Sequence, residues 1–247
     1  MIVVDGLVKA FGRRKEIRAV DGATFAALDG AITGLLGPNG AGKTTVLRML
    51  ATLIAPDAGT ASIDGLDIAR ERDGVRDRIG VLSDARGLYA RLTARENVRY
   101  YGRLHGLGGT ALEARIDLLL RQLGLAALAD RRTQGFSQGE KMKVAIARAL
   151  VHDPATIMLD EPTSGLDVMS IRGLREQLSA LRAAGKCILL STHVMQEVAL
   201  LCDRIVILGH GRVQAAGTGG ELLARTGETS LEDAFVRLLG SAEGLAA

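Results

Sequence analysis

The chain is poor in several residue types, and each shortage excludes a class of protein. Of its 247 residues none is Trp, 4 are Pro and only 3% are aromatic, so the core must be built from aliphatic side chains. Its two cysteines, Cys187 and Cys202, have apolar neighbours in the sequence, which indicates two reduced thiols and no disulfide or metal site. Neither charge dominates, because 31 basic and 28 acidic residues leave a net charge of +3. The strong basic footprint of a nucleic-acid-binding protein is missing, and we expect no nucleic acid partner.

Long hydrophobic runs are also missing. No window reaches about 18 consecutive apolar residues, and the most apolar stretch, residues 187–208, is interrupted by His193, Glu197 and Asp203. The first five residues show no basic region followed by a long apolar run, so we expect no signal peptide. The sequence therefore predicts an intracellular chain that cannot span a membrane by itself.

Glycine, in contrast, is abundant at 31 residues, and short apolar runs alternate with helical patterns along much of the chain. Strands that alternate with helices of about 10–15 residues favour a parallel sheet in an α/β fold. The glycines at 209 and 211 predict a hairpin turn after the last of these strands. The predicted strands are residues 34–36, 156–159, 187–191 and 205–208, and the predicted helices are residues 43–52 and 140–151.

Two regions depart from this alternation. The first 36 residues, together with residues 61–68, are patterned as short strands with Asp-Gly turns, and the middle of the chain is patterned as helices joined by glycine loops. Near the end, Ser230 with Asp233 three residues later indicates a capped helix. The predicted boundaries are residues 1–219 for the main unit, about 87–150 for a helical insertion and 220–247 for a helical tail.

A glycine-rich motif predicts a phosphate-binding loop. The pattern G-x-x-x-x-G-K-[ST] lies between a predicted strand and a predicted helix, as Gly37-Pro38-Asn39-Gly40-Ala41-Gly42-Lys43-Thr44. Glycines allow backbone N–H groups to turn toward a phosphate, and the start of the helix adds a favourable dipole. Lys43 is expected to reach the β- and γ-phosphates, Thr44 to ligate Mg²⁺, and Thr45 to complete the nucleotide contacts. The alternative is a glycine-rich turn that merely precedes a lysine.

Two adjacent carboxylates, Asp160 and Glu161, end the predicted strand at 156–159. Neighbouring side chains at a strand end point in different directions, so the two groups can have different roles. We expect Asp160 to hold Mg²⁺ and Glu161 to act as the general base that polarises the attacking water. By itself, an acidic pair after a strand is usually a solvated turn; the phosphate loop in the same chain favours the catalytic interpretation.

Three further motifs surround these carboxylates in order. They are Phe136-Ser137-Gln138-Gly139-Glu140 before the helix that leads to the carboxylates, Ser164-Gly165-Leu166-Asp167 after them, and Ser191-Thr192-His193 at the end of the next strand. With the phosphate loop and the acidic pair, this order resembles the ATP-binding subunits of ABC transporters, over the first 217 residues. The signature motif of that family usually reads Leu-Ser-Gly-Gly-Gln, of which this chain keeps the serine and the second glycine.

The resemblance implies a fold and an assembly. The fold is a P-loop NTPase (RecA-like) α/β core with an N-terminal antiparallel β sub-domain and an inserted helical sub-domain. The assembly is a homodimer arranged head to tail, with ATP at the interface. In such a dimer Ser137, Gln138 and Gly139 bind the γ-phosphate of the ATP held by the partner's Lys43, and Asp167 helps to form the interface.

The resemblance also implies contacts within one subunit. His193 would contact the γ-phosphate and orient the attacking water together with Glu161; its alternative is an ordinary loop histidine. Phe11 lies where the family stacks an aromatic ring on adenine, although a single Phe is more often a core residue.

One position departs from the family pattern. Where the family carries a Gln that touches Mg²⁺ and the attacking water, this chain has Asp84. A carboxylate can ligate Mg²⁺ but donates no hydrogen bond to the water. We therefore expect the metal ligands Thr44, Asp84 and Asp160.

The resemblance finally implies an ATP-hydrolysing subunit of an exporter, with ATP and Mg²⁺ as cofactors and a separate membrane permease as partner. Such a subunit is cytoplasmic and held on the inner face of the cell membrane by the permease. Residues 85–89 and 92–97 resemble the bacterial sodium-exporting subgroup, and residues 230–235 are similar to exporters of drugs and polysaccharides. Sodium export is the expected function, and export of a drug, lipid or polysaccharide is the alternative.

Two other classes fit less well. A soluble ABC ATPase acting on DNA or ribosomes typically has long coiled coils or two tandem cassettes, and this sequence has neither. A GTPase would need an Asn-Lys-x-Asp motif, and neither Asn39 nor Asn97, the only asparagines, begins one.

Overall fold

A computed structural model describes residues 1–12, 16–83 and 87–240 of the chain. Its largest element is a six-stranded sheet in the order β10-β9-β3-β8-β7-β6, in which all neighbouring strands are parallel except β9 and β10. The strands are β3 (Ile32–Leu36), β6 (Ile79–Leu82), β7 (Thr156–Asp160), β8 (Cys187–Thr192), β9 (Arg204–Gly209) and β10 (Arg212–Gly217). This architecture confirms the predicted α/β fold with a parallel sheet, and the four predicted strands are present.

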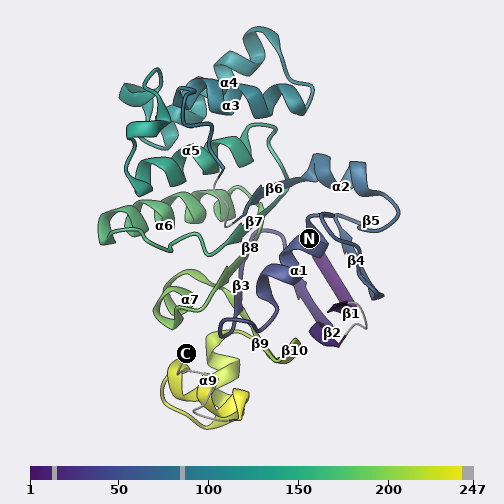
Figure 1. Ribbon diagram of the computed structural model, residues 1–247. Helices are drawn as coiled ribbons and strands as arrows, with labels where there is room; N and C mark the ends of the chain where they lie inside the picture. Colours follow the sequence, from purple (N-terminus) through teal and green to yellow (C-terminus); the bar gives the residue numbers. More distant parts are fainter. Residues whose placement is uncertain (13–15, 84–86, 241–247) are drawn as a thin grey trace.

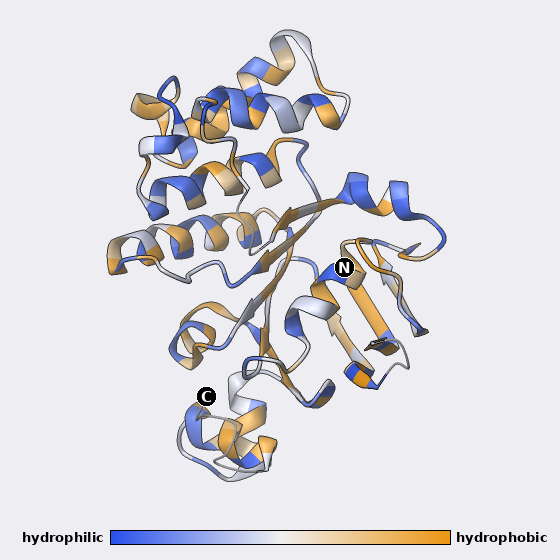
Figure 2. Ribbon diagram, viewed as in Figure 1, coloured by the Kyte–Doolittle hydropathy of each residue, from blue (hydrophilic) through white to orange (hydrophobic). Residues whose placement is uncertain are grey.

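The central strands are buried on both faces. Every residue of β3, β7 and β8 is buried, as expected for parallel strands covered on both sides, and Figure 2 shows these strands as a hydrophobic band. Alternate side chains enter different clusters: Ile157 and Leu159 pack with the helices of one face, whereas Met158 packs on the opposite face. The sheet is therefore the middle layer of three.

A second sheet covers one face of the first. It is antiparallel, in the order β2-β1-β4-β5, and together with α1 (Lys43–Leu50) it encloses an aliphatic cluster against the central strands. This sheet confirms the predicted antiparallel β sub-domain. Its strands are β1 (Ile2–Phe11), β2 (Ile17–Ala27), β4 (Ala58–Ile63) and β5 (Leu66–Asp67); α2 (Arg72–Arg78) leads back to the main sheet.

Helices cover the opposite face and extend beyond one end of the sheet (Figure 1). A single apolar cluster runs from Ile157 and Ile188 in the sheet to Leu112 and Ile116 in the outer helices, so the helical region and the core share their packing. The outer elements are α3 (Ala94–Leu104), α4 (Gly109–Gln122), the 3-10 turns η1 (Ala126–Leu128) and η2 (Thr133–Gly135), and α5 (Gln138–Leu150); α6 (Val168–Ala183) and α7 (Met195–Leu201) complete this layer.

The last described residues form α8 (Gly219–Thr226) and α9 (Leu231–Leu239), which lie at the other end of the molecule (Figure 1). Leu222 and Phe235 pack on β9 through Ile205 and Ile207. Ser230 caps α9 by accepting a hydrogen bond from the Asp233 N–H, which confirms the predicted cap. The domain boundaries at 87–150 and 220–247 stay predictions.

Some details differ from the predictions or add to them. The helix α1 ends at Leu50, two residues earlier than predicted, because Thr52 takes a left-handed conformation with φ 58° that no helix can continue. Cys187 and Cys202 are free thiols. None of the helices within the described ranges is both long and apolar enough to cross a bilayer.

Candidate functional site

The glycine-rich loop joins β3 to α1 and needs glycine at two positions for steric reasons. A Cβ atom at Gly37 would overlap the carbonyl oxygen of Leu208, and a Cβ atom at Gly42 would overlap that of Ala19. Gly42 also has φ 103°, which L-residues rarely adopt. The loop therefore lies directly against two neighbouring strands, and its path fixes where the first turn of α1 begins.

The lysine of this loop is buried beneath it. Lys43 Nζ donates to the carbonyl oxygens of Gly37 at 2.7 Å and Pro38 at 3.1 Å, and it lies 3.6 Å from Glu161 Oε1. Burial lowers the pKa of Lys43, while the carboxylates of Glu161 and Asp160 oppose that shift. The Lys43 ammonium can therefore exchange these carbonyl and carboxylate partners for an anionic ligand and still be paired with negative charge.

A cavity of about 450 Å³ opens beside this loop. It brings together one aromatic residue, the phosphate loop and both predicted carboxylates, although they come from three separate parts of the sequence. Phe11, at the end of β1, is 42% exposed and is therefore no core residue. The cavity is lined by Phe11, Ala19, Asn39, Gly40, Ala41, Gly42, Lys43, Thr44, Thr45, Asp160, Glu161 and Ser164.

The two carboxylates are held by the strand next to theirs. Asp160 pairs with Ser191 in the parallel β7–β8 ladder, and Ser191 Oγ donates a hydrogen bond to Asp160 Oδ1. The backbone N–H of Glu161 lies 3.2 Å from both Ser191 O and Ser191 Oγ. Glu161 has φ 46°, so the chain turns sharply there and the two carboxylates diverge.

The predicted histidine joins this group. His193 follows β8, and its Nδ1 lies 3.0 Å from Glu161 Oε2, while its ring is half-exposed. The same carboxylate approaches Lys43 through its other oxygen, Oε1. Glu161 thus lies between a cation and an imidazole at the edge of the cavity. This arrangement can hold a water molecule near a bound phosphate and accept its proton.

The signature residues lie elsewhere. Ser137 caps α5 in a capping box, accepting from the Glu140 N–H at 3.2 Å while its own N–H donates to Glu140 Oε2 at 2.7 Å. Asp167 caps α6 by accepting from Ser170 N and Ser170 Oγ, both at 2.9 Å. Ser137, Gln138, Gly139 and Asp167 do not line the cavity that contains Lys43.

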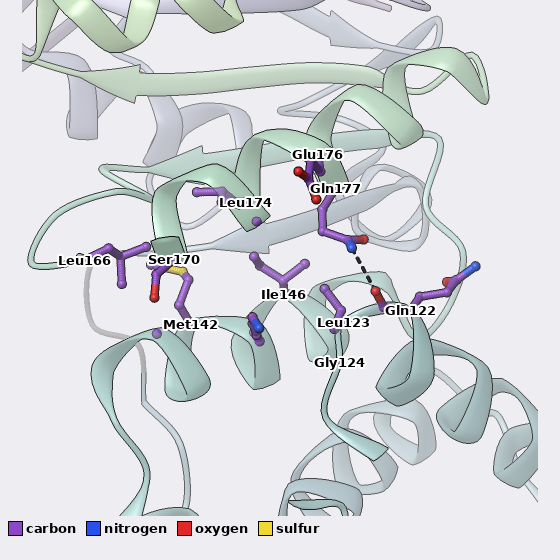
Figure 3. Close-up of a pocket in the computed structure, with 13 residues that line it drawn as sticks. Gln122, Leu123, Gly124, Met142, Ile146, Leu166, Ser170, Leu174, Glu176 and Gln177 are labelled. Atoms are coloured by element: carbon purple, nitrogen blue, oxygen red, sulfur yellow. Dashed lines mark hydrogen bonds between the residues drawn. The ribbon is translucent and has the colours of Figure 1, made fainter. Parts of the chain in front are cut away.

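A second hollow, of about 210 Å³, lies beside the start of α5 (Figure 3). Gly139 lines it where a Cβ atom would overlap Ser170 Oγ, so the signature helix and α6 are in close contact there. At the far end of the hollow Gln177 Nε2 donates to Gln122 O at 2.8 Å, joining α6 to the end of α4. At one end of the hollow α6 therefore contacts the signature helix α5, and at the other end it is bonded to the end of α4.

One predicted metal ligand, Asp84, lies outside the described residues. Three contributors were not among the predicted site residues. Ala19 and Ser164 line the cavity, and the third contributor, which binds the residues of both carboxylates, is Ser191. The sequence places it just before Thr192 and His193, but only the pairing of β7 with β8 reveals that it faces Asp160.

Comparison with known proteins agrees with this geometry. A family model described as ABC transporter matches residues 20–164. The ABC transporter ATP-binding protein NatA of Bacillus subtilis is 45% identical over 202 residues, covering 81% of this chain and 82% of its own length. The doxorubicin resistance ATP-binding protein DrrA of Mycobacterium tuberculosis is 39% identical, and the match covers 97% of this chain and 75% of DrrA. The Nod factor export ATP-binding protein I of Paraburkholderia xenovorans is 41% identical, with 90% and 72% covered.

Solved structures give the same result. The structure of an ATP-binding subunit of an ABC transporter superposes with a TM-score of 0.87 at 32% identity, covering 96% of this chain and 99% of the other. A dimeric ATP-binding cassette in a post-hydrolysis state, bound to ADP and Pi, superposes with a TM-score of 0.79 at 26% identity, covering 88% and 98%. The chain therefore belongs to the ABC transporter family and is an ATP-binding subunit of the ATPase type.

Proposed function

We propose that this chain hydrolyses ATP for an exporter, and that closure of a dimer on ATP drives transport by a separate membrane permease. The observation that carries the proposal is the single cavity that unites the phosphate loop with Asp160 and Glu161. Several relatives are named for drug resistance or for Nod factor export, which supports an exporting role. The test is Mg²⁺-dependent release of phosphate from ATP by the purified chain.

The nucleotide would be held by the loop and by Phe11. Residues 37–45 supply backbone N–H groups and the Lys43 ammonium to the phosphates, at the start of α1. The exposed ring of Phe11 at the rim of the same cavity would stack on adenine. Because stacking recognises any base, this arrangement alone does not select adenine over guanine.

The oxygen donors in the cavity fit Mg²⁺. Thr44 and Asp160 both line it and offer a hydroxyl and a carboxylate, the hard ligands that Mg²⁺ prefers. Within the described ranges no group of three or more His, Cys, Asp and Glu side chains could hold a metal by itself. This suits an ion that binds through one or two protein groups and the phosphates. Mg²⁺ would neutralise charge on those phosphates; Asp84 stays a predicted ligand.

Glu161 and His193 would perform the proton chemistry. Glu161 accepts the proton of the attacking water, and His193, 3.0 Å away, orients that water and contacts the γ-phosphate. Lys43 approaches the other oxygen of Glu161 and would move to the phosphates when ATP binds. The contact of 3.0 Å between Glu161 Oε2 and His193 Nδ1 supports these roles for the two residues.

The dimer would be arranged head to tail. Ser137 caps α5, and Gln138 and Gly139 begin its first turn. All three lie outside the cavity of their own chain, so they are free to complete the cavity of a second copy. A helix N-terminus there suits an anion such as the γ-phosphate. Asp167 would lie at the same interface. Two dimeric structures of one similar cassette support the formation of a dimer.

The permease would hold the subunit on the inner face of the cell membrane. The resemblance of residues 85–89 and 92–97 to the sodium-exporting subgroup favours sodium as the exported ion; a drug, lipid or polysaccharide is the alternative. The test is efflux of sodium from vesicles that contain the chain with its permease, with Glu161→Gln as the inactive control. ATP-driven efflux of a drug without sodium movement would favour the alternative.

A further inference from the structure

A buried carboxylate lies behind the Glu161–His193 pair and has no role in the proposed chemistry. Glu197 belongs to the first turn of α7 and is only 7% exposed. Its Oε2 accepts hydrogen bonds from Thr163 Oγ1 at 2.5 Å and from Thr192 Oγ1 at 3.1 Å. Both threonines are buried. One oxygen atom of α7 therefore joins two chain segments that are distant in the sequence.

These two segments carry the residues proposed for proton chemistry. Thr163 lies two residues after Glu161, in the turn that leads to α6, and Thr192 directly precedes His193. The Thr192 hydroxyl also accepts from the Val194 N–H at 3.0 Å, so it fixes the backbone on both sides of His193. The contact between Glu161 and His193 depends on how these two segments are placed.

A carboxylate is a costly group for this position unless its hydrogen bonds are used. Among residues 1–12, 16–83 and 87–240, no Lys or Arg forms an ion pair with Glu197, which is bound only by neutral hydroxyls. Burial of a charge without a cation is unfavourable, and an apolar side chain would fill the space without that penalty. A separation of 2.5 Å is typical of a charge-assisted bond, which is short and strongly directional.

We propose that Glu197 is a positioning residue for ATP hydrolysis. By binding Thr163 and Thr192 together, it sets the distance between Glu161 and His193 and so aligns the attacking water. This inference rests on the proposed function, because it needs Glu161 and His193 in their hydrolytic roles. Glu197 itself does not line the cavity that contains Lys43, so its loss lowers turnover and leaves nucleotide binding intact.

The experiment measures kcat and KM for Mg²⁺-ATP with the full chain. In Glu197→Ala we expect kcat to fall by up to about 100-fold, the loss that a misplacement of 1 Å can cause, with KM almost unchanged. Glu197→Gln keeps a carbonyl oxygen that can accept from both hydroxyls but loses the charge that strengthens these bonds, so its kcat falls less than that of Glu197→Ala. An unchanged kcat in Glu197→Ala would overturn the proposal, as would a KM that rises in proportion to the loss of kcat.

A second pair of variants covers the case in which Glu197→Ala does not fold. Thr163→Val has nearly the same shape but lacks the hydroxyl that donates to Glu197, so kcat should fall. Thr163→Ser keeps this hydroxyl, so its kcat should stay close to that of the wild type. Thr226→Val is the matched control, because Thr226 is also a buried threonine bonded to a nearby oxygen, that of Leu222, but lies in α8. Equal kcat in Thr163→Val and Thr163→Ser would count against the proposal.

The wild-type chain separates the two possible failures. If it releases no phosphate from ATP, the proposed function fails, whatever the variants do. If it is active and Glu197→Ala and Thr163→Val turn over ATP at the wild-type rate, only the positioning role of Glu197 fails.

Discussion

His193 Nδ1 lies 3.0 Å from Glu161 Oε2, although the two residues are 32 positions apart in the chain. The contact forms because β7 and β8 are parallel neighbours whose carboxyl ends meet at one edge of the sheet. That edge is where ligands bind in open α/β sheets. The phosphate loop after β3 reaches the same edge, since β3 is the neighbour of β8 on its other side.

Replacing Glu161 by Gln should abolish ATP turnover without loss of ATP binding. The amide cannot accept the proton of the attacking water, but it leaves Lys43 and the loop in place, so ATP should be trapped in a stable dimer. Steady-state phosphate release and gel filtration with ATP measure the two effects. Glu176→Gln, the same change at an exposed site in α6, is the control. Normal turnover in Glu161→Gln would exclude Glu161 as the base.

Replacing Ser137 by Arg should prevent the ATP-dependent dimer. The long cation would fill the space that the partner's γ-phosphate needs, and the loss of the cap itself costs only about 1 kcal/mol. The control is Thr218→Arg, which removes the equivalent capping-box residue from α8, remote from the phosphate loop. Gel filtration with ATP compares the two variants. An unchanged dimer in Ser137→Arg would contradict the head-to-tail arrangement.

Replacing Gly42 by Ala should remove nucleotide binding. The added Cβ would overlap the Ala19 carbonyl oxygen at a φ of 103°, so the loop must move away from β2. Gly227→Ala is the control, because Gly227 has φ 72° and open space around it and meets only the conformational cost of about 1–2 kcal/mol. Binding of a fluorescent ATP analogue compares them. Wild-type affinity in Gly42→Ala would show that the loop tolerates a side chain there.

Acid should destabilise the fold through His152. Its ring stacks on His105 with the centroids 3.6 Å apart, and its Nε2 lies 3.0 Å from Ile79 O. Burial, together with His105, lowers the pKa of His152 from 6.5 to about 4. Between these two values the unfolded chain binds a proton that the folded chain does not. The contribution of His152 is therefore complete above pH 6.5 and is lost as the pH falls toward 4.

The measurement is urea unfolding between pH 7.5 and pH 4. We expect the free energy of unfolding to decrease less steeply with acid in His152→Phe, which keeps an aromatic ring against His105 but has no proton to bind. His210→Asn is the control, since His210 is exposed in the turn between β9 and β10. If the free energy of unfolding decreases equally steeply with acid in wild type and in His152→Phe, groups other than His152 cause the loss of stability.

Much of the fold could be predicted from local sequence patterns. The buried strands β7 and β8 are continuous apolar runs, and the cap of α9 is visible in Ser230 and Asp233. The end of α1 was harder to predict from the sequence. The left-handed conformation of Thr52 follows from its surroundings and not from its residue type. The placement of Asp84 stays a prediction.

The sequence by itself determined the contiguous parts of the site. The phosphate loop, the pair Asp160–Glu161 and the signature turn at Ser137 each consist of adjacent residues, so their chemistry follows from residue type and spacing. Only the tertiary structure decided which of these parts meet. The strand order placed Ser191 on Asp160, His193 on Glu161, and Glu197 between Thr163 and Thr192, while it left Ser137 outside the cavity. Such contacts depend on which strands become neighbours, which the packing of the whole sheet fixes and no local pattern encodes.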